Sequence, residues 1–338
     1  MDSTYKALVL EGAGRELELK TVSPEPLRPG EAAVRLYAAA INHRDLWIRK
    51  GSYAGLTYPV FPGSDGAGEV EQVGEGVDGG WVGRKVIINP SLNWGTSPDA
   101  PGKDFQILGM PSPGTFAERV TVPAANLAPM PSHLSFEEAA ALPLSGLTGY
   151  RALFTRGRLR AGDKLLITGI GGGVAQFLLR FAVEAGARAW VTSGSPEKLA
   201  KGLALGALGG ADYRQEGWNE KLLQEAGPFD CIVDSAGGPG FIKLCDLLRP
   251  GGRLVFFGAT AGNPPILRSR KIFWNHLDLL GTTMGSPDEF AAMVRMVEEK
   301  KIKPVIDRVY PLAEAEQALK RMDEGGQFGK LVLRIRPG

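Results

Sequence analysis

The sequence predicts an α/β protein in which one domain holds a doubly wound parallel sheet and a second domain is mostly β. The chain of 338 residues exceeds what one hydrophobic core usually holds, so we expect two domains. Short, partly alternating β runs fill the first third of the chain, and strand-like apolar runs then alternate with helical segments. The composition, with 43% hydrophobic and 22% charged residues, gives no case for disorder.

The mostly β part runs from Lys6 to Val122. Its β runs, separated by turn residues, are KALVL, LELKT, AAVRLYAAA, GAGEVEQVG, RKVIIN and FAERVTV. This spacing is typical of a small barrel or sandwich. Residues 89–115 are irregular and rich in Pro, Gly and Ser, so we expect a long surface loop there rather than a core element.

The character of the chain changes at Ser135. Ser135 and Glu138 have capping-box spacing before an Ala-rich helical run. The apolar runs KLLIT, ARAWVTS, DCIVDS and RLVFFG then lie between helical segments, as in a parallel sheet covered on both faces. Ser286 begins another helix with a first-turn proline and a capping-box glutamate. The last run, KLVLRIR, is strand-like, so we expect the chain to return to the first domain.

A glycine-rich turn follows the first of these strands. The stretch KLLITGIGGGVAQFLLRFAVEAGARAWVTSGS, from Lys164, has the strand, turn, helix and strand of one βαβ unit. Glycines there let the backbone approach a pyrophosphate, whose charge would lie at the helix N-terminus. The alternative is a turn that is glycine-rich for packing alone. We expect a dinucleotide to contact Gly169, Gly171, Gly172, Gly173 and Val174.

The end of the second strand of this unit predicts which dinucleotide binds. NAD-binding proteins place an acid there, against the ribose 2′-hydroxyl. This chain instead has Ser193, Gly194 and Ser195, followed by Lys198, so hydroxyls and a cation are available for a 2′-phosphate. The alternative is that Ser195 only starts the next helix and Lys198 is a solvated surface residue. Both can hold, because a helix N-cap is itself an anion site, and we predict NADPH.

Charge, cysteines and apolar runs restrict the remaining classes. A net charge of +2, with no basic run among aromatics, predicts no nucleic-acid partner. Cys231 and Cys245 provide neither a disulfide framework nor a Cys-rich zinc site, which fits a reducing compartment. The N-terminus lacks a signal region, and no stretch approaches the roughly 18 apolar residues of a membrane span. We expect a cytoplasmic protein that does not bind membranes.

Six stretches spread over nearly the whole chain are AAAINHRDLWIRKGSY, FPGSDGAGEVEQVGEGV, GTFAERVTV, AALPLSGLTGYRAL, ITGIGGGVAQ and FGKLVLRI. In sequence and in order along the chain they resemble the medium-chain dehydrogenase/reductase superfamily, particularly its zinc-free quinone oxidoreductase and enoyl reductase branch. The resemblance implies a GroES-like catalytic domain at residues 1–126 and 306–338 and a Rossmann domain at residues 127–305. It also implies a homodimer or homotetramer assembled through the Rossmann sheets.

The zinc ligands of the superfamily's alcohol dehydrogenases have no counterpart in this sequence. Asn42, Ser64 with Asp65, and Leu144 stand where those relatives have Cys, a His-Glu pair and Cys. An amide, a hydroxyl and an isobutyl group cannot replace such ligands. The irregular loop also has no cysteine for a structural zinc, so we expect no metal. His43 and Asp65 could be proposed as ligands of another metal, but three histidines spread along the chain form no cluster.

Without a metal, simple alcohol oxidation loses the Lewis acid that stabilises an alkoxide. Hydride addition to a conjugated acceptor is less demanding, because an enone or quinone delocalises the new charge. The resemblance therefore implies an NADPH-dependent reductase of quinones or activated C=C bonds. Two alternatives stay open: a zinc-free aldehyde or ketone reductase, and a catalytically silent NADPH-binding structural protein.

The resemblance also implies roles for single residues. Asn42 would hydrogen-bond the cofactor or the substrate oxygen, and Tyr53 would donate a proton, although Tyr53 could equally be a loop aromatic covering the barrel and water the donor. Trp47 could stack on a flat substrate but not deliver a proton. Asp45 is expected to bond backbone amides in a turn. Further cofactor contacts are implied for Thr148, Tyr213, Ser235, Gly258, Phe328 and Lys330.

Overall fold

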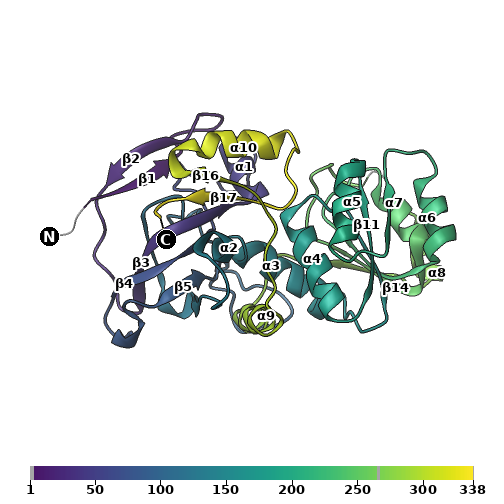
Figure 1. Cartoon of the computed structure of the whole chain (residues 1–338), viewed down its shortest axis with the longest axis horizontal. Coiled ribbons are helices and arrows are strands. Elements are labelled where there is room, and N and C mark those ends of the chain that lie inside the picture. Colours follow the sequence, from purple (N-terminus) through teal and green to yellow (C-terminus); the bar gives the residue numbers. More distant parts are fainter. Residues whose placement is uncertain (1–3, 265–266, 338) are drawn as a thin grey trace. The chain divides into compact units, whose positions relative to one another are not determined.

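The computed structural model describes residues 4–264 and 267–337 and divides the chain into two compact units (Figure 1). The first unit comprises residues 1–145 and 285–338, and the second comprises residues 146–284. The first unit is mostly antiparallel β structure, whereas the second holds a parallel sheet with helices. The predicted fold class is therefore confirmed.

A seven-stranded sheet organises the first unit. Its order is β16-β17-β3-β4-β5-β9, with β8 also paired to β3, and all pairs except β16–β17 are antiparallel. The last strand, β17, pairs with β3, so the chain returns to the first unit as predicted. The strands are β3 (Glu31–Ile41), β4 (Asp65–Val73), β5 (Lys85–Ile88), β8 (Arg119–Pro123), β9 (Leu127–Pro129), β16 (Ile306–Pro311) and β17 (Lys330–Arg334). Two further antiparallel pairs are β1 (Tyr5–Val9) with β2 (Glu18–Val22), and β6 (Ser91–Leu92) with β7 (Gln106–Ile107).

Two helices of the first unit begin where the capping signals predict. Ser135 and Ser286 each accept a backbone hydrogen bond at the N-cap, and the Glu three residues later completes both capping boxes. Helices α1 and α10 contact one another (Figure 1). The α-helices are α1 (His43–Arg49), α2 (Phe136–Ala140), α9 (Pro287–Lys300) and α10 (Ala315–Asp323), with 3-10 turns at Gly79–Trp81, Ala124–Asn126 and Leu312–Glu314. Helix α3 (Pro143–Tyr150) contains the boundary between the units.

The second unit is built on six parallel strands in the order β12-β11-β10-β13-β14-β15. This is the strand order of a dinucleotide-binding Rossmann sheet. The strands are β10 (Lys164–Ile167), β11 (Arg188–Ser193), β12 (Gly209–Asp212), β13 (Phe229–Asp234), β14 (Leu248–Phe256) and β15 (Asp278–Gly281). The helices are α4 (Gly173–Glu184), α5 (Pro196–Ala204), α6 (Trp218–Ala226), α7 (Phe241–Leu247) and α8 (Ser269–Trp274), and residues Arg151–Arg156 form a π-helix. The sequence did not reveal β12 and β15, because these outer strands are short and carry no long apolar run.

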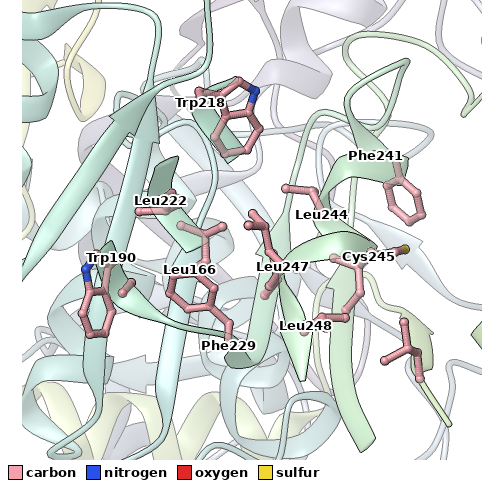
Figure 2. Close-up of a cluster of buried hydrophobic side chains, with 14 residues drawn as sticks. Leu166, Trp190, Trp218, Leu222, Phe229, Phe241, Leu244, Cys245, Leu247 and Leu248 are labelled. Carbon is pink, nitrogen blue, oxygen red and sulfur yellow. The ribbon is translucent and has the colours of Figure 1, made fainter. Parts of the chain in front are cut away.

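A hydrophobic cluster joins the parallel sheet to helices α6 and α7 (Figure 2). Phe229 at the start of β13 is fully buried, and its ring meets Trp190 of β11 edge to face with centroids 5.6 Å apart. Leu222 of α6 and Leu247 of α7 pack in the same cluster. The alternating apolar runs are thus buried by the helices that the sequence places between them.

The first unit extends further than the boundaries expected at residues 126 and 306. Helix α2 packs on β3, β4 and β17, and Ser132 donates two hydrogen bonds to Glu298 of α9. Residues 127–145 and 285–305 therefore cluster with the first unit rather than with the parallel sheet.

The expectation of a pure surface loop at residues 89–115 is wrong at both ends of the segment. Leu92 of β6 and Leu108, directly after β7, are buried in the core cluster of the first sheet. No helix in the described ranges is long and apolar enough to cross a membrane.

Candidate functional site

The glycine turn of the second unit is fixed to two strand ends. Gly169 follows β10 with a φ of +64°, a conformation that favours glycine. The backbone amide of Ile170 donates to the carbonyl of Thr192 at 2.9 Å, which ties the turn to the end of β11. Gly172 is the N-cap of α4, so the first-turn amides of Gly173 and Val174 have no partner within the helix. These amides can receive a phosphate.

A buried glutamine that the sequence analysis missed supports this turn. Gln176 is 2% exposed, and its Nε2 donates to the carbonyl oxygen of Ile170 at 2.5 Å. This bond holds the middle of the glycine turn against the first turn of α4. The sequence carried a sign of this role, because Gln176 is a polar residue on the apolar face of the helix GVAQFLLRFAV.

The end of β11 has the polar surroundings that the sequence predicts. The Ser193 hydroxyl accepts from the amide of Ser195 at 3.1 Å, and the Ser195 hydroxyl accepts from the amide of Lys198 at 3.3 Å. Ser195 is thus the N-cap of α5, which agrees with the alternative that Ser195 starts this helix. A helix N-cap can also bind an anion.

Two side chains from the end of β12 lie over Gly194. A Cβ at Gly194 would come within 2.5 Å of Nε of Arg214 and 3.0 Å of Cζ of Tyr213. The structure therefore brings Tyr213, Gly194 and Ser193 together, as the resemblance implies. It adds Arg214, which the sequence analysis missed because β12 itself was not recognised.

The ends of β13 and β14 approach closely. A Cβ at Gly258 would lie 2.5 Å from the carbonyl oxygen of Ser235, so only glycine permits this approach. Asp234, the last residue of β13, accepts from Oγ1 of Thr168 at 2.6 Å and from the amide of Gly237 at 2.8 Å, which ties the end of β13 to the end of β10. The strand-end residues therefore share the carboxyl edge of the sheet, where ligands bind in such folds.

Thr148 is buried in α3, and its Oγ1 lies 4.0 Å from Sδ of Met284. Phe328 is also buried, and its backbone amide donates to Asp307 at 3.0 Å. The cofactor roles that the resemblance implies for these two residues remain predictions.

A buried lysine is the centre of a polar network in the first unit. Nζ of Lys330 donates to Asn42 Oδ1 at 2.6 Å, to Asp65 Oδ2 at 3.0 Å and to Ser145 Oγ at 3.3 Å. The side chains of Lys330 and Asp65 are 3% and 0% exposed. The three hydrogens of the ammonium thus have three acceptors. Removing one partner of such a buried ion pair costs about 3–5 kcal/mol.

Asp65 completes this network. Its Oδ2 also accepts from Asn42 Nδ2 at 2.9 Å, and its Oδ1 accepts from the backbone amide of Leu144 at 2.7 Å. Ser64 is held separately, because Arg44 donates to its hydroxyl at 2.7 Å.

The residues aligned with zinc ligands do not fit zinc. They contribute an amide, a hydroxyl, a backbone amide and one carboxylate that is already paired with an ammonium. Zinc requires several Cys, His or carboxylate ligands in a tetrahedral set. In the part of the chain that the structure describes, no group of three or more His, Cys, Asp or Glu could hold a metal ion.

Asp45 is buried beneath this network and bonds backbone amides, as expected. Its carboxylate accepts from the amide of Asn42 at 2.8 Å and from that of Gly63 at 3.3 Å. Burial raises the pKa of Asp45 to about 6, although the nearby Arg44 charge favours the ionised form. His43 is the first residue of α1, and desolvation and then the positive charge of Lys330 lower its pKa.

Tyr53 is half-buried beside the same helix. Its ring packs on the cluster of Leu10, Ile48, Val60 and Met110, and the Arg44 guanidinium lies 5.1 Å from the ring centroid. Trp47 instead has the Lys50 ammonium 5.7 Å from its ring centroid. The ring of Tyr53 thus covers a hydrophobic cluster of the first unit. Proton donation by its hydroxyl remains a prediction.

Family models match both parts of the chain. Residues 28–132 match the alcohol dehydrogenase GroES-like domain, and residues 205–333 match the zinc-binding dehydrogenase family. A zinc-type alcohol dehydrogenase-like protein YogA from Leptosphaeria maculans is 37% identical over 94% of each chain. A crystal structure of an NAD-dependent alcohol dehydrogenase is 37% identical, with a TM-score of 0.92 over 98% of this chain and 99% of the other.

Two relatives with named reactions are more distant. An acryloyl-coenzyme A reductase from Sulfurisphaera tokodaii is 29% identical over 97% of this chain and 99% of the relative. A quinone oxidoreductase from Rattus norvegicus is 28% identical over 97% and 96%.

A Rossmann unit with a glycine turn, together with a GroES-like unit, defines an oxidoreductase of the kind that uses nicotinamide cofactors. The chain belongs to the medium-chain dehydrogenase/reductase superfamily, and the resemblance read from its motifs is confirmed.

Proposed function

We propose that the protein is a zinc-independent, NADPH-dependent reductase that transfers hydride to a quinone or to an activated C=C bond. The observation that carries this proposal is the Lys330 network, because an ammonium and its partners engage the residues that align with zinc ligands. A reaction that needs a metal-stabilised alkoxide is therefore disfavoured, and an acceptor that delocalises its own charge is favoured.

The reaction needs one hydride and one proton. Bound NADPH would supply the hydride and leave as NADP⁺, and a proton would neutralise the negative charge that the acceptor oxygen gains. Asn42 is assigned to hydrogen-bond that oxygen, and the phenol of Tyr53 is assigned to donate the proton. Two relatives of the chain, a quinone oxidoreductase and an acryloyl-coenzyme A reductase, support the quinone and the activated C=C bond as acceptors.

The preference for NADPH is supported by the surroundings of Gly194. Ser193 and Ser195 bring hydroxyls to the end of β11, and Arg214 brings a guanidinium over Gly194. A guanidinium is suited to a phosphate dianion, and no carboxylate stands at the end of β11 to repel it. The carboxylate of Asp212, at the end of β12, accepts a hydrogen bond from the backbone amide of Arg214.

A homodimer or homotetramer is part of the proposal. Strand β15 is an outer strand of the parallel sheet, and the neighbouring helix α8 exposes Trp274 at 72% and Phe273 at 63%. Exposed apolar side chains beside an outer strand are suited to pairing with a second copy. Sedimentation of the purified protein measures this directly.

A panel of quinones, enones and aldehydes, each tested with NADPH and with NADH, tests the reaction. We expect oxidation of NADPH with quinones or enones and a clear preference over NADH. Turnover of aldehydes alone would favour the second candidate, an aldehyde or ketone reductase, which the 37% identity to an alcohol dehydrogenase supports. Tight NADPH binding with no turnover of any acceptor would favour the silent structural protein.

A further inference from the structure

The Asn42 carboxamide is held between two opposite charges. Its Oδ1 accepts from the Lys330 ammonium at 2.6 Å, and its Nδ2 donates to the Asp65 carboxylate at 2.9 Å. A flipped amide would place NH₂ against the ammonium and C=O against the carboxylate, so only one orientation is possible. Lys330 and Asp65 thus determine where the second hydrogen of Nδ2 points.

Neither charge can move away from Asn42. The carboxylate of Asp65 is fixed by the backbone amide of Leu144 at 2.7 Å, and the ammonium of Lys330 is fixed by Ser145 at 3.3 Å. These side chains are buried, with Asn42 itself 6% exposed and Ser145 2% exposed. The residues come from separate segments of the first unit, namely the start of α1, β4, α3 and β17.

We propose that Lys330 is a positioning residue that takes over part of the work of a metal: its ammonium orients and polarises Asn42 as the hydrogen-bond donor to the reduced acceptor oxygen. This inference rests on the proposed hydride transfer to a quinone or enone. A cation bonded to Oδ1 draws electron density from the amide and strengthens its remaining N–H donor. A donor that is oriented before the reaction needs no reorganisation when charge develops on the acceptor.

All three hydrogens of the Lys330 ammonium have acceptors within the chain. The ammonium therefore acts through Asn42, and it has no unused donor for a cofactor phosphate. This gives Lys330 a different role from the direct cofactor contact implied by the resemblance.

The test uses the double variant Lys330→Met with Asp65→Asn, which removes both buried charges together and so leaves neither unpaired. We expect kcat with a quinone to fall by about 10- to 100-fold, while the Kd for NADPH and the melting temperature change little. A double variant with kcat within twofold of the parent protein would overturn the proposal.

Asn42→Ala provides the matched comparison. If Lys330 acts through Asn42, adding the double substitution to Asn42→Ala lowers kcat by less than about threefold, because the shared donor is already gone. Effects that multiply instead would overturn the proposal. If the double variant does not fold, Ser145→Ala removes one acceptor of the ammonium without unpairing a charge, and kcat should fall by about two- to fivefold.

A second measurement does not depend on turnover. With asparagine labelled by ¹⁵N, the side-chain NH₂ signals of Asn42 are identified by their loss in Asn42→Ala. We expect one slowly exchanging hydrogen in the parent protein and fast exchange of both in the double variant. Slow exchange in both proteins would contradict the positioning role, whereas a parent protein that shows the slow hydrogen but reduces no acceptor would contradict only the proposed function.

Discussion

The most informative single change is Arg214→Ala, which tests the proposed preference for NADPH over NADH. The guanidinium lies over Gly194, since Nε would be 2.5 Å from a Cβ at that position. A hydrogen bond to a charged group contributes about 1.5–3 kcal/mol when buried. Because Arg214 is exposed, we take about 1 kcal/mol, which corresponds to about a fivefold loss of affinity for NADPH.

The assay is steady-state kinetics with each coenzyme at a saturating acceptor concentration. We expect KM for NADPH to rise by the stated factor, while KM for NADH stays unchanged because NADH has no 2′-phosphate. Gly194→Ala should have a similar effect, since its Cβ would displace the flexible end of Arg214. Equal changes for the two coenzymes would refute the assignment.

The matched control is Arg160→Ala. Arg160 is also exposed in the second unit, but it precedes β10 and so lies toward the amino edge of the sheet, opposite the carboxyl ends of the strands. Its substitution should leave both KM values unchanged. A rise in the KM for NADPH in this variant would mean that general positive charge, and not Arg214 itself, determines the preference.

Three further predictions concern stability and the glycine turn. Gln176→Leu removes the bond to Ile170 and should raise the Kd for NADPH by about fivefold, whereas the exposed Gln224→Leu should not change it, as measured by NADPH fluorescence titration. Phe229→Ala should lower the free energy of unfolding in urea by about 3–5 kcal/mol because Phe229 is fully buried, and an equal loss for Phe273→Ala, 63% exposed, would contradict this reasoning. Burial raises the Asp45 pKa from 3.8 to about 6, so the folded state binds this proton more tightly, and about 3 kcal/mol of stability should be lost as the pH rises from below 4 to above 6. Asp45→Asn should make the free energy of unfolding independent of pH in this range, apart from other groups. An unchanged pH dependence would contradict the assignment of this loss to Asp45.

Local chemistry made much of the fold predictable. Capping boxes at Ser135 and Ser286 and the glycine turn at Gly169 are encoded within a few neighbouring residues, and the structure shows all three. Strands β12 and β15 were missed because outer strands need less apolar sequence than inner ones. The core role of Leu92 was also missed, since the composition of a loop does not show which of its side chains turn inward.

The candidate site was less predictable because its polar contacts join distant segments. Asn42 and Lys330 are 288 positions apart, and no local pattern reveals that the ammonium meets the carboxamide. Alignment with the zinc ligands of relatives identified Asn42 and Asp65. The contact of Lys330 with them became visible only once the structure paired β17 with β3. Arg214 required β12, whose end brings it over Gly194.

The central claim is that a buried ammonium, and no metal, serves the reducing site. Its most direct test is the zinc content of the purified protein, measured by mass spectrometry together with quinone-dependent NADPH oxidation before and after treatment with a zinc chelator. We expect far less than one zinc per chain and a rate that the chelator does not change. One zinc per chain, with activity lost on chelation and restored by added zinc, would contradict the claim.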